Sequence, residues 1–331
     1  MRRRAPDTGR MSEVAGLALP FFSLIFLGAV AGRIWRREEN ALAWLNTYVI
    51  YFALPALFFQ LISRTPIGEL ANWSFVFATS LATYTAFALA FAFAAVRNGG
   101  KIAEAILQGM VGGYGNVGYM GPPLALVALG PAAAVPAALI FCFDVALVFT
   151  LAPLMMAVAG TGGESLPRAL VVIPRKVLLH PFILATLAGV AGAALGMRPP
   201  EPIDRLLDAL SGSSAPCALF ALGVTVASRP LKRVPMELPV LILIKLAVHP
   251  ALVFAILTWI GGFQRLWIET AVLMASLPPA ATIYVLATQY DTYVLRASSA
   301  ILLGTAASVF TVTGVLYLIA HDLLPFWLVG A

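Results

Sequence analysis

The residue Asn116 lies inside a run of glycine and proline, GGYGNVGYMGPP, that occupies residues 112–123. Glycine and proline are the poorest helix formers, yet the sequence on both sides of the run is apolar enough for a membrane-spanning helix. Hydrocarbon offers no hydrogen bonds, so a broken helix at membrane depth is tolerated only where it is buried in protein or lines a cavity. The run therefore indicates a binding site, at which the Asn116 amide either binds a ligand or caps the broken helix.

A second break, SLPP, occupies residues 276–279 of a later apolar stretch. Proline favours the first turn of a helix, so each Pro-Pro pair is expected to open a half-helix whose positive end points into the protein. Two such ends favour an anionic ligand, whereas the carbonyl ends of the preceding half-helices would suit Na⁺. The structural alternative is a simple kink in each packed helix. The candidate substrate-binding residues are Gly115, Asn116, Gly118, Gly121, Pro122, Pro123, Pro278, Pro279 and Thr282.

Two charged residues lie in the middle of apolar stretches, Asp144 and Lys245. Ionisable side chains at membrane depth are costly and usually functional. We therefore interpret Asp144 as a proton or cation site and Lys245 as its partner or as an attractor of anions; a structural ion pair is the alternative. Two histidines, His180 and His249, each precede a proline near the ends of apolar stretches, and we interpret both as structural.

The composition requires a membrane protein. Of the 331 residues, 61% are hydrophobic and only 11% are charged, and the mean hydropathy is +0.92, whereas soluble proteins carry about 25% charged residues. The net charge of +6 comes from basic residues in short connections, a pattern typical of membrane topology rather than of a nucleic-acid partner. The apolar stretches predict ten membrane-spanning helices: 15–34, 40–62, 72–96, 102–129, 132–159, 174–196, 205–228, 236–260, 266–289 and 295–320.

The two halves of the chain resemble each other. A shift of 161 residues places Pro20-Phe21 on Pro181-Phe182, Gly28 on Gly189, Pro55 on Pro216, and Val148-Phe149-Thr150 on Val309-Phe310-Thr311. The matches predict two five-helix repeats, 11–160 and 161–331, after an N-terminal tail, 1–10, that precedes a plausible start at Met11. Because five is odd, the repeats would be inverted in the membrane.

The distribution of basic residues gives the orientation. With the N-terminus outside, the inner connections hold 12 Lys and Arg residues and the outer ones hold 4, which agrees with the positive-inside rule. The N-terminal tail, with Arg2, Arg3, Arg4 and Arg10, argues the other way unless the chain starts at Met11. The inner set is Arg33, Arg36, Arg37, Arg97, Lys101, Arg168, Arg175, Lys176, Arg229, Lys232, Arg233 and Arg296, and the outer set is Arg64, Arg198, Arg205 and Arg265. The prediction is that both termini lie outside a plasma (inner) membrane.

Several classes of protein are excluded or disfavoured. The sequence has no G-x-x-x-x-G-K-[ST] loop for a primary pump and no H-E-x-x-H motif for an intramembrane enzyme. Cys142 and Cys217 lie in apolar runs and show no disulfide or metal spacing, and no cofactor is expected. A sodium/proton antiporter would need adjacent carboxylates, and a sodium symporter of the bile-acid type would be recognised by its dependence on Na⁺.

The segment NVGYMGPPL, residues 116–124, resembles the Asn-x-Gly-x-x-Gly-x-Pro-Leu motif of the auxin efflux carrier family, which includes plant PIN carriers and bacterial malonate-type permeases. LPPAATIYVLATQYD, SSAILLGTAASVFT and LPFFSLIFLGAVAGR are similar to other segments of that family, so the resemblance covers nearly the whole chain. Two departures are Pro122, where the family has an apolar residue, and Thr282, where it often has asparagine.

The resemblance implies an all-α membrane protein of ten helices in two inverted repeats, whose fourth and ninth helices are broken and cross. Helices 1, 2, 6 and 7 would form a scaffold and helices 3–5 and 8–10 a moving transport domain. The implied function is secondary transport of a small organic anion, a mono- or dicarboxylate, by an elevator-like motion, with the carboxylate near Asn116 and the second crossover. H⁺ or Na⁺ would be the coupling partner, unless the carrier is a uniporter, and a homodimer would form through the scaffold.

Overall fold

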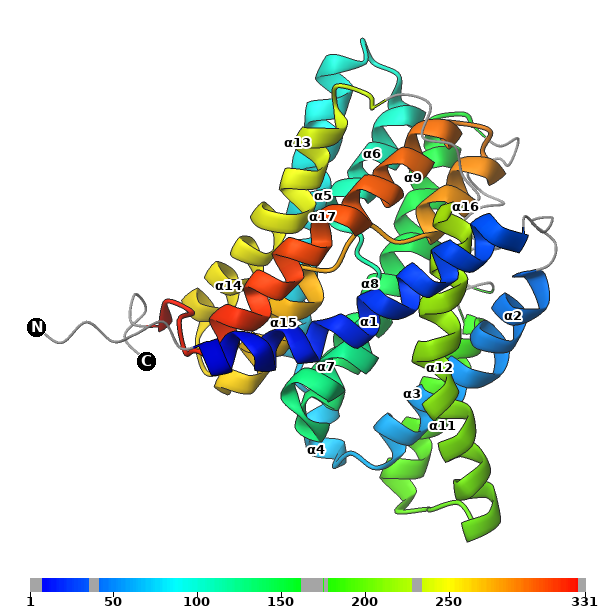
Figure 1. Cartoon of the computed structure of the whole chain (residues 1–331), viewed down its shortest axis with the longest axis vertical. Helices are drawn as coiled ribbons and strands as arrows, with labels where there is room; N and C mark the ends of the chain where they lie inside the picture. The colour runs from blue at the N-terminus through cyan, green and yellow to red at the C-terminus, as the bar shows by residue number, and fades with distance from the viewer. Residues whose placement is uncertain (1–7, 36–41, 162–174, 176–177, 228–233, 327–331) are drawn as a thin grey trace, which may run out of the picture.

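The computed structural model describes residues 8–35, 42–161, 175, 178–227 and 234–326, and all the regular structure in these ranges is helical (Figure 1). The first half contains α1 (Thr8–Trp35), α2 (Ala43–Tyr48), α3 (Leu54–Ser63), α4 (Ile67–Leu70), α5 (Trp73–Arg97), α6 (Ile102–Gly113), α7 (Gly121–Leu129), α8 (Ala134–Ala146) and α9 (Ala152–Val158). The second half contains α11 (Pro181–Leu195), α12 (Glu201–Ala227), α13 (Leu238–Leu243), α14 (His249–Ile260), α15 (Arg265–Ala275), α16 (Thr282–Gln289) and α17 (Val294–Ala320).

Three of the helices are joined to the one before by a single wide π turn: η2 (Val49–Ala53), η4 (Leu147–Leu151) and η5 (Ile244–Val248). In each case a proline is the second residue of the next helix: Pro55, Pro153 or Pro250. A proline inside a helix lacks an N–H and its ring clashes with the carbonyl four residues earlier, and the wider turn relieves both problems. Such turns are frequent at functional sites, and Lys245 lies in the third.

Within the described ranges, five helices are long and apolar enough to cross a bilayer: Ala43–Ser63, Ile67–Arg97, Glu201–Thr225, Leu238–Ile260 and Val294–Ala320. Three shorter apolar helices are Leu19–Trp35, Pro131–Val145 and Pro181–Leu195. The predicted fourth and ninth spans are each divided in two, as α6 with α7 and α15 with α16. The protein is thus an all-helical, multi-pass membrane protein, while the full set of ten spans in inverted repeats stays a prediction.

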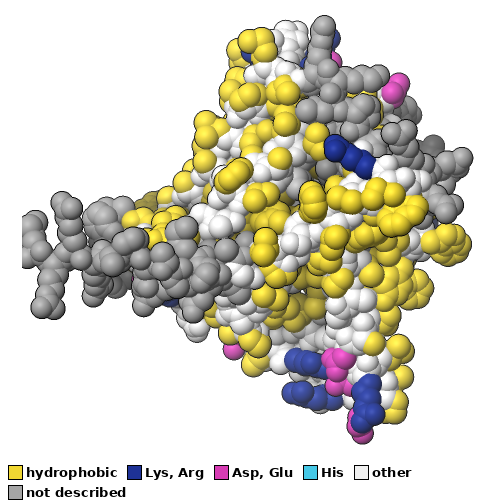
Figure 2. Space-filling model, viewed as in Figure 1, with side chains coloured by type: hydrophobic (Ala, Val, Ile, Leu, Met, Phe, Trp, Pro, Cys, Tyr) yellow, Lys and Arg dark blue, Asp and Glu magenta, His cyan; other side chains and the backbone are white. Residues whose placement is uncertain are grey.

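The helices pack in two groups. In one, α3 contacts α11 and α12, and α1 lies along α12; in the other, α5 contacts α6 and α14, and α15 contacts α8 and α14. Figure 1 shows α2, α3, α11 and α12 at the lower right, and α5, α13 and α14 at the upper left. Figure 2 shows hydrophobic side chains over most of one face, with charged side chains gathered at its lower end, as expected for a surface that faces lipid.

Glycines allow the closest helix contacts. Gly28 of α1 lies against the backbone of Phe220 in α12, and Gly189 of α11 lies against Ile62 of α3, so that a Cβ atom at either glycine would collide with the neighbouring helix. Small residues bring membrane helices together in this way. The 161-residue shift relates these two glycines, and each joins helices from opposite halves of the chain.

Candidate functional site

The first break occupies residues 114–120, between the end of α6 at Gly113 and the start of α7 at Gly121. Pro122 and Pro123 are the second and third residues of α7, where a missing N–H group has no cost. The prediction that this proline pair opens a half-helix is confirmed, and Gly121 rather than either proline is its first residue. A Cβ at Gly121 would lie 2.6 Å from Cε of Met274, so glycine lets α7 begin against α15.

The second break differs from the prediction. α15 ends at Ala275 and α16 begins at Thr282, so Pro278 and Pro279 precede the half-helix instead of opening it. These two prolines lie in extended backbone, where the carbonyl of Pro278 accepts a hydrogen bond and Pro279 pairs with the first break. The conformation of these two prolines is therefore set by their pairing with the first break. It is not set by the preference of proline for the first turn of a helix.

The two breaks cross as a short antiparallel pair. Gly115 forms a β-bridge with Pro279; the Asn116 N–H donates to the Pro278 carbonyl at 2.8 Å, and the Ala280 N–H donates to the Tyr114 carbonyl at 3.3 Å. Each broken segment thus satisfies backbone groups of the other, which explains how both persist at a depth where water is scarce. The crossing also fixes the position of the Asn116 side chain.

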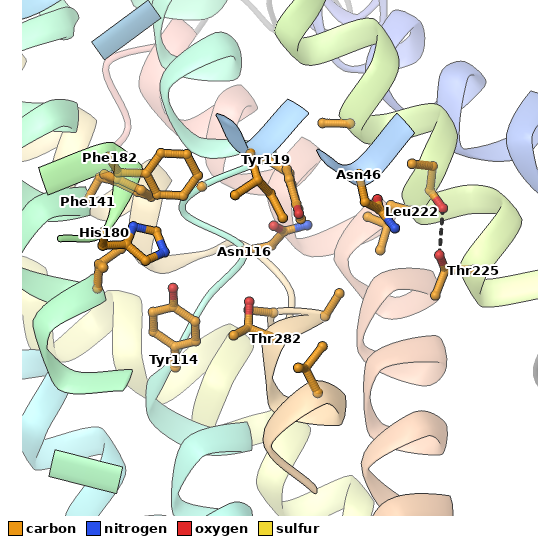
Figure 3. Close-up of a pocket in the computed structure, with 18 residues that line it drawn as sticks. Asn46, Tyr114, Asn116, Tyr119, Phe141, His180, Phe182, Leu222, Thr225 and Thr282 are labelled. Atoms are coloured by element: carbon orange, nitrogen blue, oxygen red, sulfur yellow. Dashed lines mark hydrogen bonds between the residues drawn. The ribbon is translucent and has the colours of Figure 1, made fainter. Parts of the chain in front are cut away.

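A cavity of about 320 Å³ adjoins the crossing (Figure 3). Of the nine predicted binding residues, Asn116, Gly118 and Thr282 line it among the described residues. Gly115, Pro278 and Pro279 belong to the crossing, and Gly121, Pro122 and Pro123 form the first turn of α7. Thr282 is the first residue of α16, so no preceding turn of its own helix is available to its hydroxyl. The positive end of α16 therefore adjoins the cavity. The polar lining is completed by Asn46, Tyr114, Tyr119, His180 and Thr225, and the apolar lining includes Phe141, Phe182, Ala218, Ala221 and Leu222.

The Asn116 side chain gives the clearest indication of a ligand in the cavity. It is 2% exposed, and its Nδ2 atom has no hydrogen-bond partner among the described residues. A buried polar group left unpaired costs about 1–3 kcal/mol, and a carboxylate oxygen in the cavity would accept its hydrogen bond. In Figure 3 Asn116 lies at the centre of the cavity, with His180 and Asn46 on opposite sides. The geometry favours the ligand role of Asn116 over the alternative role as a cap.

Lys245 lies behind the crossing and is fully buried. Its Nζ atom donates to the carbonyl of Ala275, the last residue of α15, at 2.5 Å, and it lies 3.1 Å from Nδ1 of His249. A Cβ at Gly115 would lie 3.1 Å from the same ammonium. The lysine therefore caps the negative end of one broken helix and touches the backbone of the other break.

Asp144, on α8, interacts electrostatically with Lys245 and also interacts with the hydroxyl of Thr83 on α5. The Thr83 hydroxyl lies 3.2 Å from Nε2 of His249. The two charges predicted from the sequence thus come together, and the structure adds His249 and Thr83 to them. No sequence signal identified Thr83, and the proline that follows His249 favoured a structural role for that histidine. The contact between the two residues could be found only in the three-dimensional structure.

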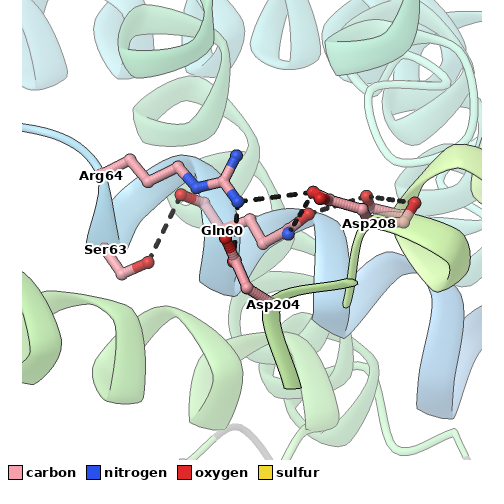
Figure 4. A network of polar contacts seen from close by, with 6 residues as sticks. Gln60, Ser63, Arg64, Asp204 and Asp208 are labelled. Carbon is pink, nitrogen blue, oxygen red and sulfur yellow. Dashed lines mark hydrogen bonds and ion pairs between the residues drawn. The ribbon is translucent and has the colours of Figure 1, made fainter. Parts of the chain in front are cut away.

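A second polar network joins α3 to α12, away from the cavity (Figure 4). Arg64 Nη2 lies 2.7 Å from Asp204 and 3.4 Å from Asp208. The buried side chain of Gln60 donates to Asp208 at 2.7 Å and accepts from Ser211 at 2.7 Å. These contacts join helices of the two halves at the charged end of the molecule and have no connection to the crossing.

Comparison with known proteins identifies a family and two relatives of this chain. Residues 14–316 match the model of a family described as "Membrane transport protein". A "Putative malonate transporter" of Rhizobium meliloti (strain 1021) is 51% identical over 316 residues, which cover 95% of this chain and 98% of that protein. An "Uncharacterized transporter" of Methanothermobacter thermautotrophicus is 24% identical over 286 residues, which cover 86% of this chain and 91% of that protein.

Proposed function

Since the chain belongs to the membrane transport family that includes the auxin efflux carriers, we propose that it is a secondary carrier of a small mono- or dicarboxylate. The chain is a transporter and not an enzyme. Its relative at 51% identity is named for malonate, which makes malonate the first substrate to test. The proposed setting is the plasma membrane, with both termini outside, as the distribution of basic residues favours.

One observation carries the proposal: the buried side chain of Asn116, whose Nδ2 atom has no partner among the described residues, lines a cavity at the crossing of two broken helices. A carboxylate would satisfy this donor and gain from the positive end of α16. Hydrogen bonds to charged groups are worth about 1.5–3 kcal/mol, more than those to neutral groups. A neutral polar ligand would gain less from the helix end, so the site favours an anion.

The position of the cavity supports an elevator-like motion. One wall comes from α2, η2, α11 and α12, the helices expected to form the scaffold, and includes Asn46 and Phe182. The other wall comes from the first break, α8 and α16, which belong to the expected transport domain, and includes Asn116 and Val145. A ligand between two such groups is exposed to one side or the other when they slide. The scaffold helices are also the proposed surface of a homodimer.

The buried residues behind the crossing, Lys245, His249, Thr83 and Asp144, favour one coupling ion over another. The carbonyl end of α15 is one of the two helix ends at which the sequence allowed Na⁺, and the Lys245 ammonium already caps it. A tethered cation there favours proton coupling or uniport over Na⁺ coupling, with Asp144 and Lys245 as the coupling residues. A Na⁺-coupled symporter remains the second candidate function, since Na⁺ sites in such folds use carbonyls of broken helices.

The test is uptake by the purified full-length chain in proteoliposomes. Radiolabelled malonate and acetate are supplied with and without a Na⁺ gradient, and empty liposomes serve as the control. We expect malonate uptake that is saturable, above the control and independent of Na⁺. Uptake of neither anion, together with no thermal stabilisation by any of a panel of mono- and dicarboxylates, would refute the proposed function. Uptake that requires Na⁺ would select the second candidate.

A further inference from the structure

Four buried side chains form a series of polar contacts behind the crossing. Nζ of Lys245 lies 3.1 Å from Nδ1 of His249, Nε2 of His249 lies 3.2 Å from the Thr83 hydroxyl, and Asp144 interacts with that hydroxyl. The exposed fractions of the four are 0%, 2%, 3% and 5% in the same order. They come from three separate stretches of the sequence, on α5, on α8, and on η5 with α14, so only the fold brings them together.

The chain has one consistent direction. An ammonium group only donates, so Nδ1 of His249 accepts from Lys245. The proton of the neutral imidazole then resides on Nε2, which donates to the oxygen of Thr83. The Thr83 hydroxyl keeps its own hydrogen for the carboxylate of Asp144, which only accepts when ionised. Each contact along the chain therefore joins one donor to one acceptor.

Few other titratable groups face the chain. Tyr84 on α5 and Tyr114 in the first break interact electrostatically with Asp144. The charged residues on neighbouring helices pair with one another: Glu104 of α6 with Arg296 of α17 at 3.3 Å, and Arg265 with Glu269 of α15 at 2.7 Å. The four-residue chain thus holds one positive and one negative charge when Lys245 and Asp144 are both ionised.

We propose that this chain is the proton site of the carrier: it takes up one proton from water when a carboxylate binds at Asn116, and it moves protons between Lys245 and Asp144. With Asp144 protonated and Lys245 charged, the cluster carries one net positive charge beside Gly115, which offsets the one negative charge of a carboxylate. Offsetting a buried charge lowers its desolvation cost. The inference rests on the proposed function, and it adds His249 and Thr83 as proton-transferring groups.

The internal transfer balances. The N–H bond at Lys245 breaks as a new one forms at Nδ1 of His249, and the N–H bond at Nε2 breaks as Thr83 gains that hydrogen. The original O–H bond of Thr83 breaks as Asp144 becomes protonated. Lysine and aspartate end neutral, the histidine ends as its other tautomer, and threonine is unchanged. The reverse steps restore the two charges.

The test compares proton movement with anion movement in the same proteoliposomes, which contain a pH-sensitive dye and receive radiolabelled malonate. Thr83→Val removes the hydroxyl with little change of shape, and Thr83→Ser restores it. The matched control is Thr79→Val, one turn earlier on α5, because the Thr79 hydroxyl is equally buried but bonds only to its own helix.

We expect proton influx with malonate in the wild type, and uptake that slows as the external pH rises. Thr83→Val should reduce proton influx per malonate at least tenfold and flatten this pH profile, while malonate still stabilises the protein thermally. Thr83→Ser and Thr79→Val should keep both properties. If Thr83→Val does not fold, the same two measurements, proton influx per malonate and the pH profile of uptake, are made on His249→Gln. The glutamine amide can keep the hydrogen bonds of His249 but cannot relay protons.

Two results would overturn the relay. One is a Thr83→Val or His249→Gln variant with the wild-type proton-to-malonate ratio and pH profile. The other is wild-type malonate uptake without proton influx. Both leave the proposed anion transport intact, whereas a wild type that neither transports nor binds a carboxylate would refute the proposed function itself.

Discussion

Replacing Asn116 by alanine separates a ligand-binding role from a capping role, because the two roles predict opposite effects on the empty protein. The variant loses only the side-chain amide, and the backbone N–H of residue 116 keeps its 2.8 Å bond to Pro278. Since Nδ2 has no partner among the described residues, its removal relieves a penalty of about 1–3 kcal/mol. The free energy of unfolding of the ligand-free protein should therefore stay equal or rise.

The affinity of Asn116→Ala for the anion should fall. Loss of a hydrogen bond to a carboxylate costs about 1.5–3 kcal/mol, and each 1.4 kcal/mol is about tenfold in affinity. The Kd for malonate should therefore increase roughly 10- to 150-fold in Asn116→Ala. At a concentration near 100 times the wild-type Kd, the wild type should gain about 2.7 kcal/mol of stability from malonate, and the variant much less.

The assay is thermal unfolding of detergent-solubilised protein over a series of malonate concentrations, followed by uptake in proteoliposomes. Asn98→Ala is the matched control, because its Nδ2 atom is also buried and unpaired among the described residues but lies at the end of α5, outside the cavity. The reasoning would be refuted by an Asn116→Ala protein with the wild-type Kd. It would equally be refuted by a ligand-free variant about 1 kcal/mol less stable, the loss expected of a helix cap.

Three further predictions concern stability, measured by denaturant or thermal unfolding in the same detergent. Gly28→Ala should cost about 1–3 kcal/mol because the new methyl group meets the backbone of α12, while Gly16→Ala on the same helix, with open space around it, should not destabilise. Lys245→Met should cost about 3–5 kcal/mol by leaving the buried carboxylate of Asp144 without a nearby opposite charge, and adding Asp144→Leu should recover part of that loss. A double variant as unstable as the sum of both single variants would contradict this coupling. Arg64→Ala should lower the free energy of unfolding by less than about 1 kcal/mol despite its two ion pairs, because its side chain is 44% exposed. A larger loss would show that the α3–α12 network contributes strongly to stability.

The sequence was sufficient for features that depend on local preference or on composition. The apolar stretches located most of the helices to within a few residues, and the glycine and proline runs located both breaks. α1 is an exception, because it begins at Thr8, inside the expected tail 1–10 and before the predicted start at 15. It also identified the buried pair Asp144 and Lys245, since a charge inside an apolar stretch is visible without a structure.

Features that depend on contacts between distant segments could not be predicted. The antiparallel pairing of Gly115 with Pro279 overrides the helix-starting preference of Pro278 and Pro279, and local propensity carries no information about a partner 164 residues away. Asn46 and Thr83 resemble ordinary polar residues of apolar helices in sequence. They acquire a role only because the fold places one at the cavity and the other beside His249.

The pairing of the two breaks also affects how the chain is made. Gly115 leaves the ribosome long before Pro279 is synthesised, and at about 5–20 residues per second the delay for these 164 residues is roughly 8–33 s. During that time the peptide groups of the first break lack the partner that later satisfies them. Until the second half is synthesised, these peptide groups of the first half must therefore form hydrogen bonds with water or with another protein. Completion of the transport site thus belongs to a late stage of biogenesis, and truncation before residue 279 should yield a protein that the cell degrades.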